Sequence, residues 1–110
     1  MPNPNKRRGD KAELEVQTLW RDNVGVFARR ALGAGRKDDV GDIHGIPNTV
    51  CQVVASKHVA NAVRNKPKQA EQQRRNAQVD HACTFVRLYG GDYAVVMTPD
   101  QFFKLWRDAL

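Results

Sequence analysis

The chain has 110 residues, 41% of them hydrophobic, which predicts one soluble domain with a modest core. Its 18 Lys and Arg against 12 Asp and Glu give a formal net charge of +6, which favours a polyanionic partner such as nucleic acid. No apolar stretch approaches the roughly 20 residues that span a bilayer, and Cys51 and Cys83 lack metal-ligand spacing. We therefore expect a cytoplasmic protein without a membrane segment or a zinc site.

The first half of the chain predicts a helix followed by three strands. Residues 1–9 are basic and rich in Pro and Asn, so we expect a flexible arm there and a single domain over residues 10–110. Apolar side chains recur at helical spacing from Ala12 to Trp20, which predicts a helix over about residues 10–22. The three strands are expected on either side of a Gly-rich, charged loop at residues 33–41, over residues 26–32, 42–46 and 49–55.

The second half predicts a helix, two strands and a last helix. Residues 58–78 are polar, and within this stretch we expect a helix that starts near Pro67. Two strands, at residues 82–88 and 93–97, flank Gly90 and Gly91 and predict a hairpin. Residues 98–101, Thr-Pro-Asp-Gln, form a capping-box pattern that opens the last helix. That helix has an apolar face made of Phe102, Phe103, Leu105, Trp106 and Leu110.

Several segments resemble Holliday junction resolvases. Residues 9–15, Gly-Asp-Lys-Ala-Glu-Leu-Glu, followed by Leu-Trp-Arg at 19–21, resemble the opening helix of the archaeal enzymes, where an Ala-Glu pair begins an amphipathic helix. Residues 28–30 and 39–43, Asp-Val-Gly-Asp-Ile, resemble the corresponding stretch in small resolvase-like proteins of actinobacterial phages. Residues 69–81 resemble the second helix of those proteins and its exit. The similarity covers most of the chain after residue 9.

The resemblance implies an α/β fold of the restriction-endonuclease-like type. Such a fold has a central mixed five-stranded sheet flanked by helices in the order αβββαβ, here followed by a further strand and a C-terminal helix. It also implies a metal-dependent endonuclease that hydrolyses phosphodiester bonds in branched or double-stranded DNA, in the host cytoplasm if the protein is encoded by a phage. Carboxylates in such a site hold Mg²⁺ or Mn²⁺, and a cation stabilises the developing charge. A homodimer is expected, because two symmetric strands must be cut.

The family site combines an acid on the first helix, an Asp at a strand end and a Glu-x-Lys on the next strand. The match places Glu13 in the helix position, with Glu15 as the fallback. Asp42 is the expected strand acid, because it stands where a loop enters an apolar strand.

The Glu-x-Lys element is broken in both possible registers. With Gln52 in the Glu position the Lys position is Val54, and with Lys57 in the Lys position the acidic position is Ala55. Gln52 and Lys57 face opposite sides of a strand unless a bulge intervenes or Lys57 lies past the strand's end. We therefore expect a degenerate catalytic site of Glu13, Asp42, Gln52 and Lys57, with the first three as metal ligands.

Eight basic side chains are expected to contact DNA phosphates without reading bases: Arg29, Arg30, Arg36, Lys37, Lys66, Lys68, Arg74 and Arg75. Asp38 and Asp39 either orient arginines or join the metal ligands. The aromatic side chains of the last helix belong either to a dimer interface or to the core.

Three hypotheses follow for the function. The chain is a working nuclease with a shifted lysine, a natural nuclease relic that binds DNA or a partner without cleaving, or an engineered inactive variant. RNA binding ranks last, because it rests on charge alone.

Overall fold

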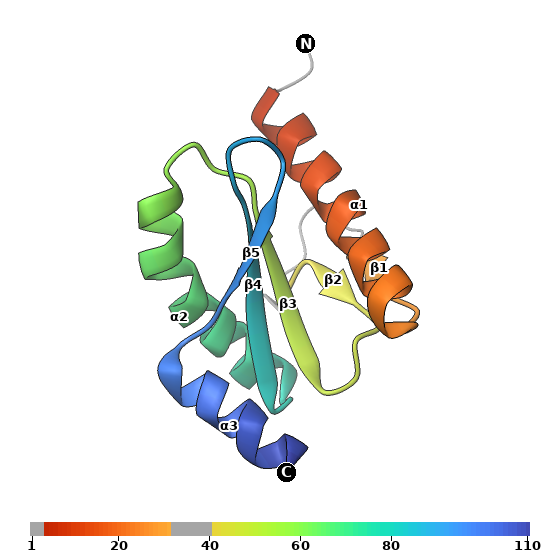
Figure 1. Cartoon of the computed structure of the whole chain (residues 1–110), viewed down its shortest axis with the longest axis vertical. Coiled ribbons are helices and arrows are strands. Elements are labelled where there is room, and N and C mark those ends of the chain that lie inside the picture. The colour runs from red at the N-terminus through yellow and green to blue at the C-terminus, as the bar shows by residue number, and fades with distance from the viewer. Residues whose placement is uncertain (1–3, 32–40) are drawn as a thin grey trace.

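The computed structural model describes residues 4–31 and 41–110 (Figure 1). The elements follow the order αβββαββα, which confirms the expected order. Their bounds are α1 (Pro4–Val24), β1 (Arg29–Arg30), β2 (Ile43–His44), β3 (Thr49–Val54), α2 (Val59–Ala77), β4 (His81–Arg87), β5 (Tyr93–Val96) and α3 (Pro99–Ala109). Within this part of the chain, no helix is both long enough and apolar enough to cross a membrane.

Two helix boundaries differ from those expected. Helix α1 begins at Pro4 and not at about residue 10, so part of the expected arm is helical. Proline is tolerated in a first turn, because its missing N–H would have no helical partner there. Pro67 lies inside α2, not near its start. Ala62 and Ala70, on either side of it, are buried against the sheet, and this packing carries the helix through the proline.

The five strands form one mixed sheet in the order β1-β2-β3-β4-β5. Only β3 and β4 are parallel, with Gln52 opposite Thr84, and α2 is the crossover between them. The other three pairs are antiparallel, including the predicted hairpin of β4 and β5. The strand expected over residues 26–32 is reduced to the two residues of β1.

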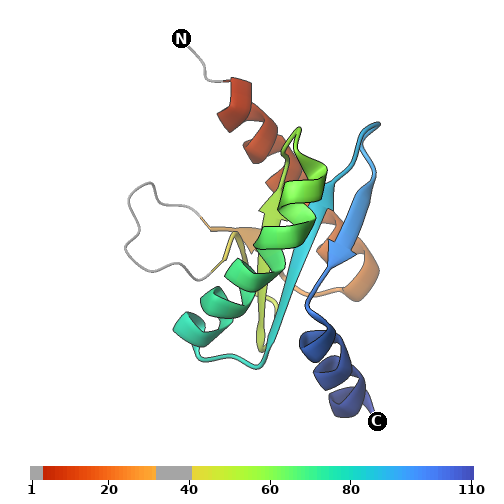
Figure 2. The same cartoon turned by 90° about the vertical axis from the view of Figure 1, so that its left-hand side faces the viewer.

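The two faces of the sheet carry different helices. Val50 packs with Ala70 of α2, whereas Cys51, the next residue along β3, packs with Val16 of α1. Alternating side chains of one strand thus fill two core layers. Figure 2 shows α2 and α3 on opposite sides of the strands. Helix α1 therefore shares the second face with α3.

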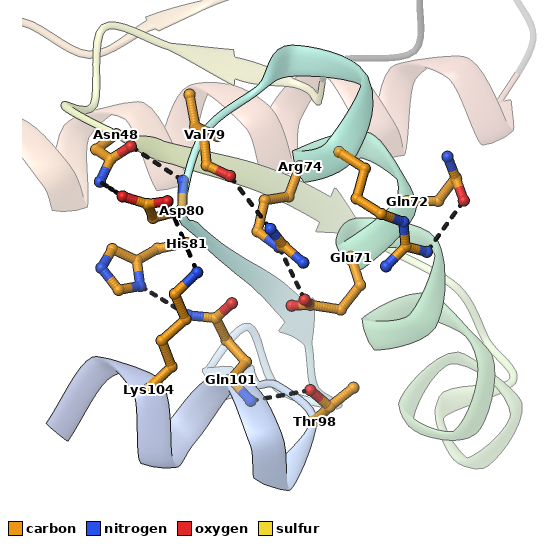
Figure 3. Close-up of polar contacts among 11 residues, drawn as sticks. Asn48, Glu71, Gln72, Arg74, Val79, Asp80, His81, Thr98, Gln101 and Lys104 are labelled. Carbon is orange, nitrogen blue, oxygen red and sulfur yellow. Dashed lines mark hydrogen bonds and ion pairs between the residues drawn. The ribbon is translucent and has the colours of Figure 1, made fainter. Parts of the chain in front are cut away.

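Helix α3 meets the sheet through its first turn. The Thr98 hydroxyl accepts a hydrogen bond from the Gln101 backbone N–H at 3.2 Å, so the predicted N-cap is confirmed. The other half of the capping box is absent, because the Gln101 side chain instead contacts His81 Nδ1 at 2.9 Å (Figure 3). Phe103 and Trp106 are 55% and 57% exposed, so core packing does not account for this aromatic stripe.

Candidate functional site

A polar groove runs along the second half of β3, between that strand and α2. Among its lining residues are Asp42, Gln52 and Ser56 from the sheet side and Lys66 and Gln69 from α2. We call it the β3 groove. It exists because the register pairs β2 with β3 at Ile43 and Cys51, and no strand within residues 4–31 and 41–110 covers the edge beyond that point.

Backbone hydrogen bonds fix Asp42 at this edge. Its N–H donates to Cys51 O at 2.9 Å, and its carbonyl accepts from the Ala31 N–H at 2.8 Å. One carboxylate oxygen, Oδ2, accepts from the Val53 N–H at 2.8 Å. Gly41 precedes it with φ +98°, and a Cβ there would lie 2.9 Å from a Val50 methyl and 3.1 Å from Cys51 O. Only glycine lets the chain come so close to β3, so Gly41 helps to set the position of Asp42.

The pKa of Glu13, on α1, is affected by charges of both signs. Burial, followed by the negative charge of Asp42, raises its pKa, while the Arg30 guanidinium acts in the other direction. Arg30 Nε donates to Glu13 Oε1 at 3.1 Å, and Arg30 Nη2 lies 2.7 Å from Asp10 Oδ1. The negative charge of Asp42 therefore acts on Glu13, although Glu13 is not among the residues that line the β3 groove.

Gln52 is buried, and both ends of its side-chain amide are engaged inside the fold. Its Oε1 accepts from the Thr84 hydroxyl at 3.4 Å, and its Nε2 lies 3.4 Å from Gln69 Oε1. The amide oxygen is therefore turned toward β4. This geometry does not favour the expected role of Gln52 as a metal ligand.

The structure places two of the predicted lysines, Lys57 and Lys66, in different pockets. Lys57 is exposed, lies past the end of β3 and lines a different pocket, together with Arg87. Lys66, expected only as a DNA contact, lines the β3 groove, where its Nζ lies 3.1 Å from Gln69 Oε1. The cation that shares a groove with Asp42 is therefore Lys66. The spacing of Lys66, Gln69 and Gln73 along α2 was the sequence signal for this polar helix face.

The remaining predicted DNA contacts fall into three groups. Arg29, Lys68 and Arg75 are exposed. Arg30 and Arg74 form ion pairs within the chain, and Arg74 Nε lies 2.9 Å from Glu71 Oε1 (Figure 3). Arg36 and Lys37 lie outside the described residues, as do Asp38 and Asp39.

The donor set can be compared with the needs of a metal ion. Residues 4–31 and 41–110 contain no group of three or more His, Cys, Asp or Glu side chains that could hold one together. Magnesium, however, commonly binds through one or two carboxylates and keeps several waters. Glu13 and Asp42, whose negative charges repel each other, are the two carboxylates that could contribute to such a site without Gln52.

Comparisons of the chain with protein-family models, with curated protein sequences and with solved structures gave no match. The function must therefore be argued from the chemistry of the site.

Replacing Glu13 with Gln should change how stability depends on pH. Because the fold raises the Glu13 pKa above 4.5, the unfolded chain releases this proton first. The free energy of unfolding of the wild type therefore falls as pH rises from about 4.5 through the folded pKa. Glu13→Gln lacks this loss. We expect the variant to gain stability relative to the wild type across that interval, measured by urea unfolding in EDTA.

Asp80→Asn is the control, because the fold lowers the pKa of Asp80 whereas it raises that of Glu13. Its hydrogen bond from Asn48, then the charge of Lys104, lowers the Asp80 pKa below 3.8, so the wild type gains stability as pH rises toward that value. The asparagine variant should lose stability relative to the wild type in this lower window. A stability difference for Glu13→Gln that is independent of pH would contradict the raised pKa of Glu13.

Proposed function

We propose that the chain is a structure-selective, metal-dependent endonuclease that hydrolyses phosphodiester bonds in branched DNA. The observation that carries this proposal is the β3 groove, which is lined by Asp42, before β2, and by Lys66, on α2. A fixed carboxylate and a cation in one groove suit a reaction in which negative charge develops on a phosphate. The net charge of +6 favours the same polyanionic substrate.

The architecture supports the proposal in a second way. The order αβββαβ, with β3 and β4 parallel around α2, agrees with the restriction-endonuclease-like fold that the resemblance implies. In that fold the acids are expected on the first helix and at the end of a strand, where Glu13 and Asp42 lie in this chain. The agreement supports a common fold, and the chemistry rests on the side chains.

Each side chain has a distinct role in the proposed reaction. A divalent cation held by Asp42 and Glu13 would polarise the phosphate and supply an activated water. Lys66, oriented by Gln69 at 3.1 Å, would stabilise the developing negative charge. Arg29, Lys68 and Arg75 are exposed and would bind phosphates along the strand without reading bases.

The alternative is a protein that binds DNA without cleaving it. Two observations favour this alternative: the Glu-x-Lys positions hold Gln52 and Val54, and Arg30 already neutralises part of the charge of Glu13. Both hypotheses need the same groove and the same basic surface. They differ only in chemistry, so a cleavage assay separates them.

Cleavage of a labelled four-way DNA junction, with linear duplex as competitor, tests the proposal. In Mg²⁺ or Mn²⁺ we expect paired cuts that are absent in EDTA and in Asp42→Asn. Lys66→Ala should lower the rate about 100-fold or more, because it removes a cation aimed at developing charge. Arg64→Ala is the matched control, since Arg64 is an exposed cation on the same helix, and the rate should stay close to that of the wild type.

Tight junction binding without cuts in either metal would overturn the enzyme proposal and establish the non-cleaving alternative. Full activity of Lys66→Ala would show that the catalytic cation lies elsewhere.

We infer that the enzyme acts as a homodimer paired through α3, because paired cuts across one junction need two sites. Phe102, Phe103 and Trp106 are all about half exposed on this helix, as expected for a face that a partner covers. The helix carries two acidic and two basic side chains, Asp100, Asp108, Lys104 and Arg107. Its charges therefore balance, and two copies of a chain of net charge +6 can meet there without strong local repulsion.

Sedimentation velocity tests this interface. The wild type should sediment as a dimer and Trp106→Glu as a folded monomer, because the substitution places two carboxylates in an apolar contact. Leu14→Glu is the control: Leu14 is 49% exposed on α1, away from α3, and its substitution should leave the dimer intact. A monomeric wild type would contradict the inference, as would a dimer that survives Trp106→Glu.

A further inference from the structure

A second, basic pocket adjoins the β3 groove. It is lined by Arg8 of α1, by Ser56 and Lys57 after β3, and by Arg87 and Tyr89 of the β4–β5 hairpin. We call it the hairpin pocket. Figure 1 shows the tip of this hairpin beside the connection from β3 to α2. Ser56 also lines the β3 groove, so the two hollows adjoin at this residue.

The charge of the hairpin pocket is positive. It contains three cationic side chains, from Arg8, Lys57 and Arg87, and none of the described residues that line it is acidic. Lys57 and Arg8 form no ion pair with any residue that the structure describes. Arg87 does face Glu15, but its Nε lies 3.6 Å from Glu15 Oε1, which is too long for a hydrogen bond. The hairpin pocket therefore has more positive charge than its surroundings neutralise.

One side-chain donor of the residues that line the hairpin pocket has no acceptor within the described part of the chain. Arg87 Nε is buried and has no hydrogen-bond partner. A buried donor of this kind costs free energy until an acceptor reaches it. The start of α2 also borders the pocket at Val59, and its N-cap residue, His58, gives no side-chain cap. The unbonded N–H groups of a first turn add to the attraction for an anion.

Tyr89 determines which anion fits best. Its side chain is fully exposed, at 102%, although it stands at the rim of a charged pocket. An exposed aromatic ring next to cations is the combination with which proteins hold single-stranded nucleic acid, since bases stack on the ring while phosphates bind the cations. A free inorganic anion would make no use of the ring.

We propose that the hairpin pocket binds a phosphate of an unpaired nucleotide, whose base stacks on Tyr89. The proposal rests on the proposed function for the identity of the polymer, a DNA strand that continues from the β3 groove through Ser56. Bases are available for stacking only where a strand leaves the duplex. The hairpin pocket therefore gives a physical basis for selecting branched over linear DNA.

Fluorescence anisotropy in EDTA, where no cleavage occurs, tests this pocket. The probes are a labelled blunt duplex and the same duplex with an unpaired arm. Tyr89→Ala should weaken binding of the unpaired-arm probe about tenfold and leave the blunt duplex nearly unchanged, whereas Tyr89→Phe keeps the stacking surface and should bind like the wild type. Lys57→Ala should reduce the slope of log K against log salt by about one, as expected for one lost phosphate contact. Lys11→Ala, an exposed cation on α1, should change neither quantity.

Equal losses on both probes with Tyr89→Ala, or no loss, would overturn the stacking proposal. Millimolar inorganic phosphate that displaces the unpaired-arm probe as completely as excess oligonucleotide does would show a simple anion site. This result would also overturn the stacking proposal. A junction assay on the same preparations separates this result from the proposed function. Selective binding that depends on Tyr89, without cleavage, would overturn the proposed nuclease activity and support the proposed role of the hairpin pocket. Cleavage without this selectivity would support the nuclease activity and overturn the proposed role of the pocket. A wild type that binds neither probe would overturn both.

Discussion

The attachment of Asp42 to the edge of β3 is the interaction on which the fold and the proposed site both depend. Strands β1 and β2 have two residues each, too few to hold a sheet edge by ladder hydrogen bonds alone. Asp42 adds three hydrogen bonds. Its N–H donates to Cys51 O, its carbonyl oxygen accepts from the Ala31 N–H, and its carboxylate accepts from the Val53 N–H. The same carboxylate ends the pairing of β2 with β3. The uncovered part of β3 then becomes the floor of the β3 groove.

Helix α1 contributes a negative side chain to this site, and helix α2 contributes a positive one. From α1 comes Glu13, whose carboxylate is repelled by Asp42 and partly balanced by Arg30. From α2 comes Lys66, held only by the amide oxygen of Gln69. The acidic side of the site therefore carries two carboxylates whose repulsion Arg30 only partly balances, and the basic side has charge to offer to a phosphate. Lys57 and Arg87 extend the positive charge beyond Ser56, along the path that a DNA strand would follow.

Local patterns in the sequence predicted the order of elements well, because periodicity and turn chemistry act over a few residues. The Thr98 N-cap and the hairpin at Gly90 and Gly91 are examples. Glu13 and Asp42 were named from the sequence, but Lys66 was not assigned to the groove, since no local pattern shows which turn of α2 faces β3. Pro67 misled for the same reason: packing of Ala62 and Ala70 against the sheet decides where α2 begins. The burial of Gln52 against Thr84 depends on the parallel register of β3 and β4, which periodicity does not contain.

Anomalous diffraction from crystals grown with Mn²⁺ would show whether Asp42 and Glu13 bind a divalent cation, because it locates the ion without relying on turnover. We expect one manganese peak bound to the carboxylates of Asp42 and Glu13 and the loss of that peak in Asp42→Asn crystals. A wild-type structure with no manganese at these two carboxylates, at a Mn²⁺ concentration that supports cleavage, would contradict this expectation.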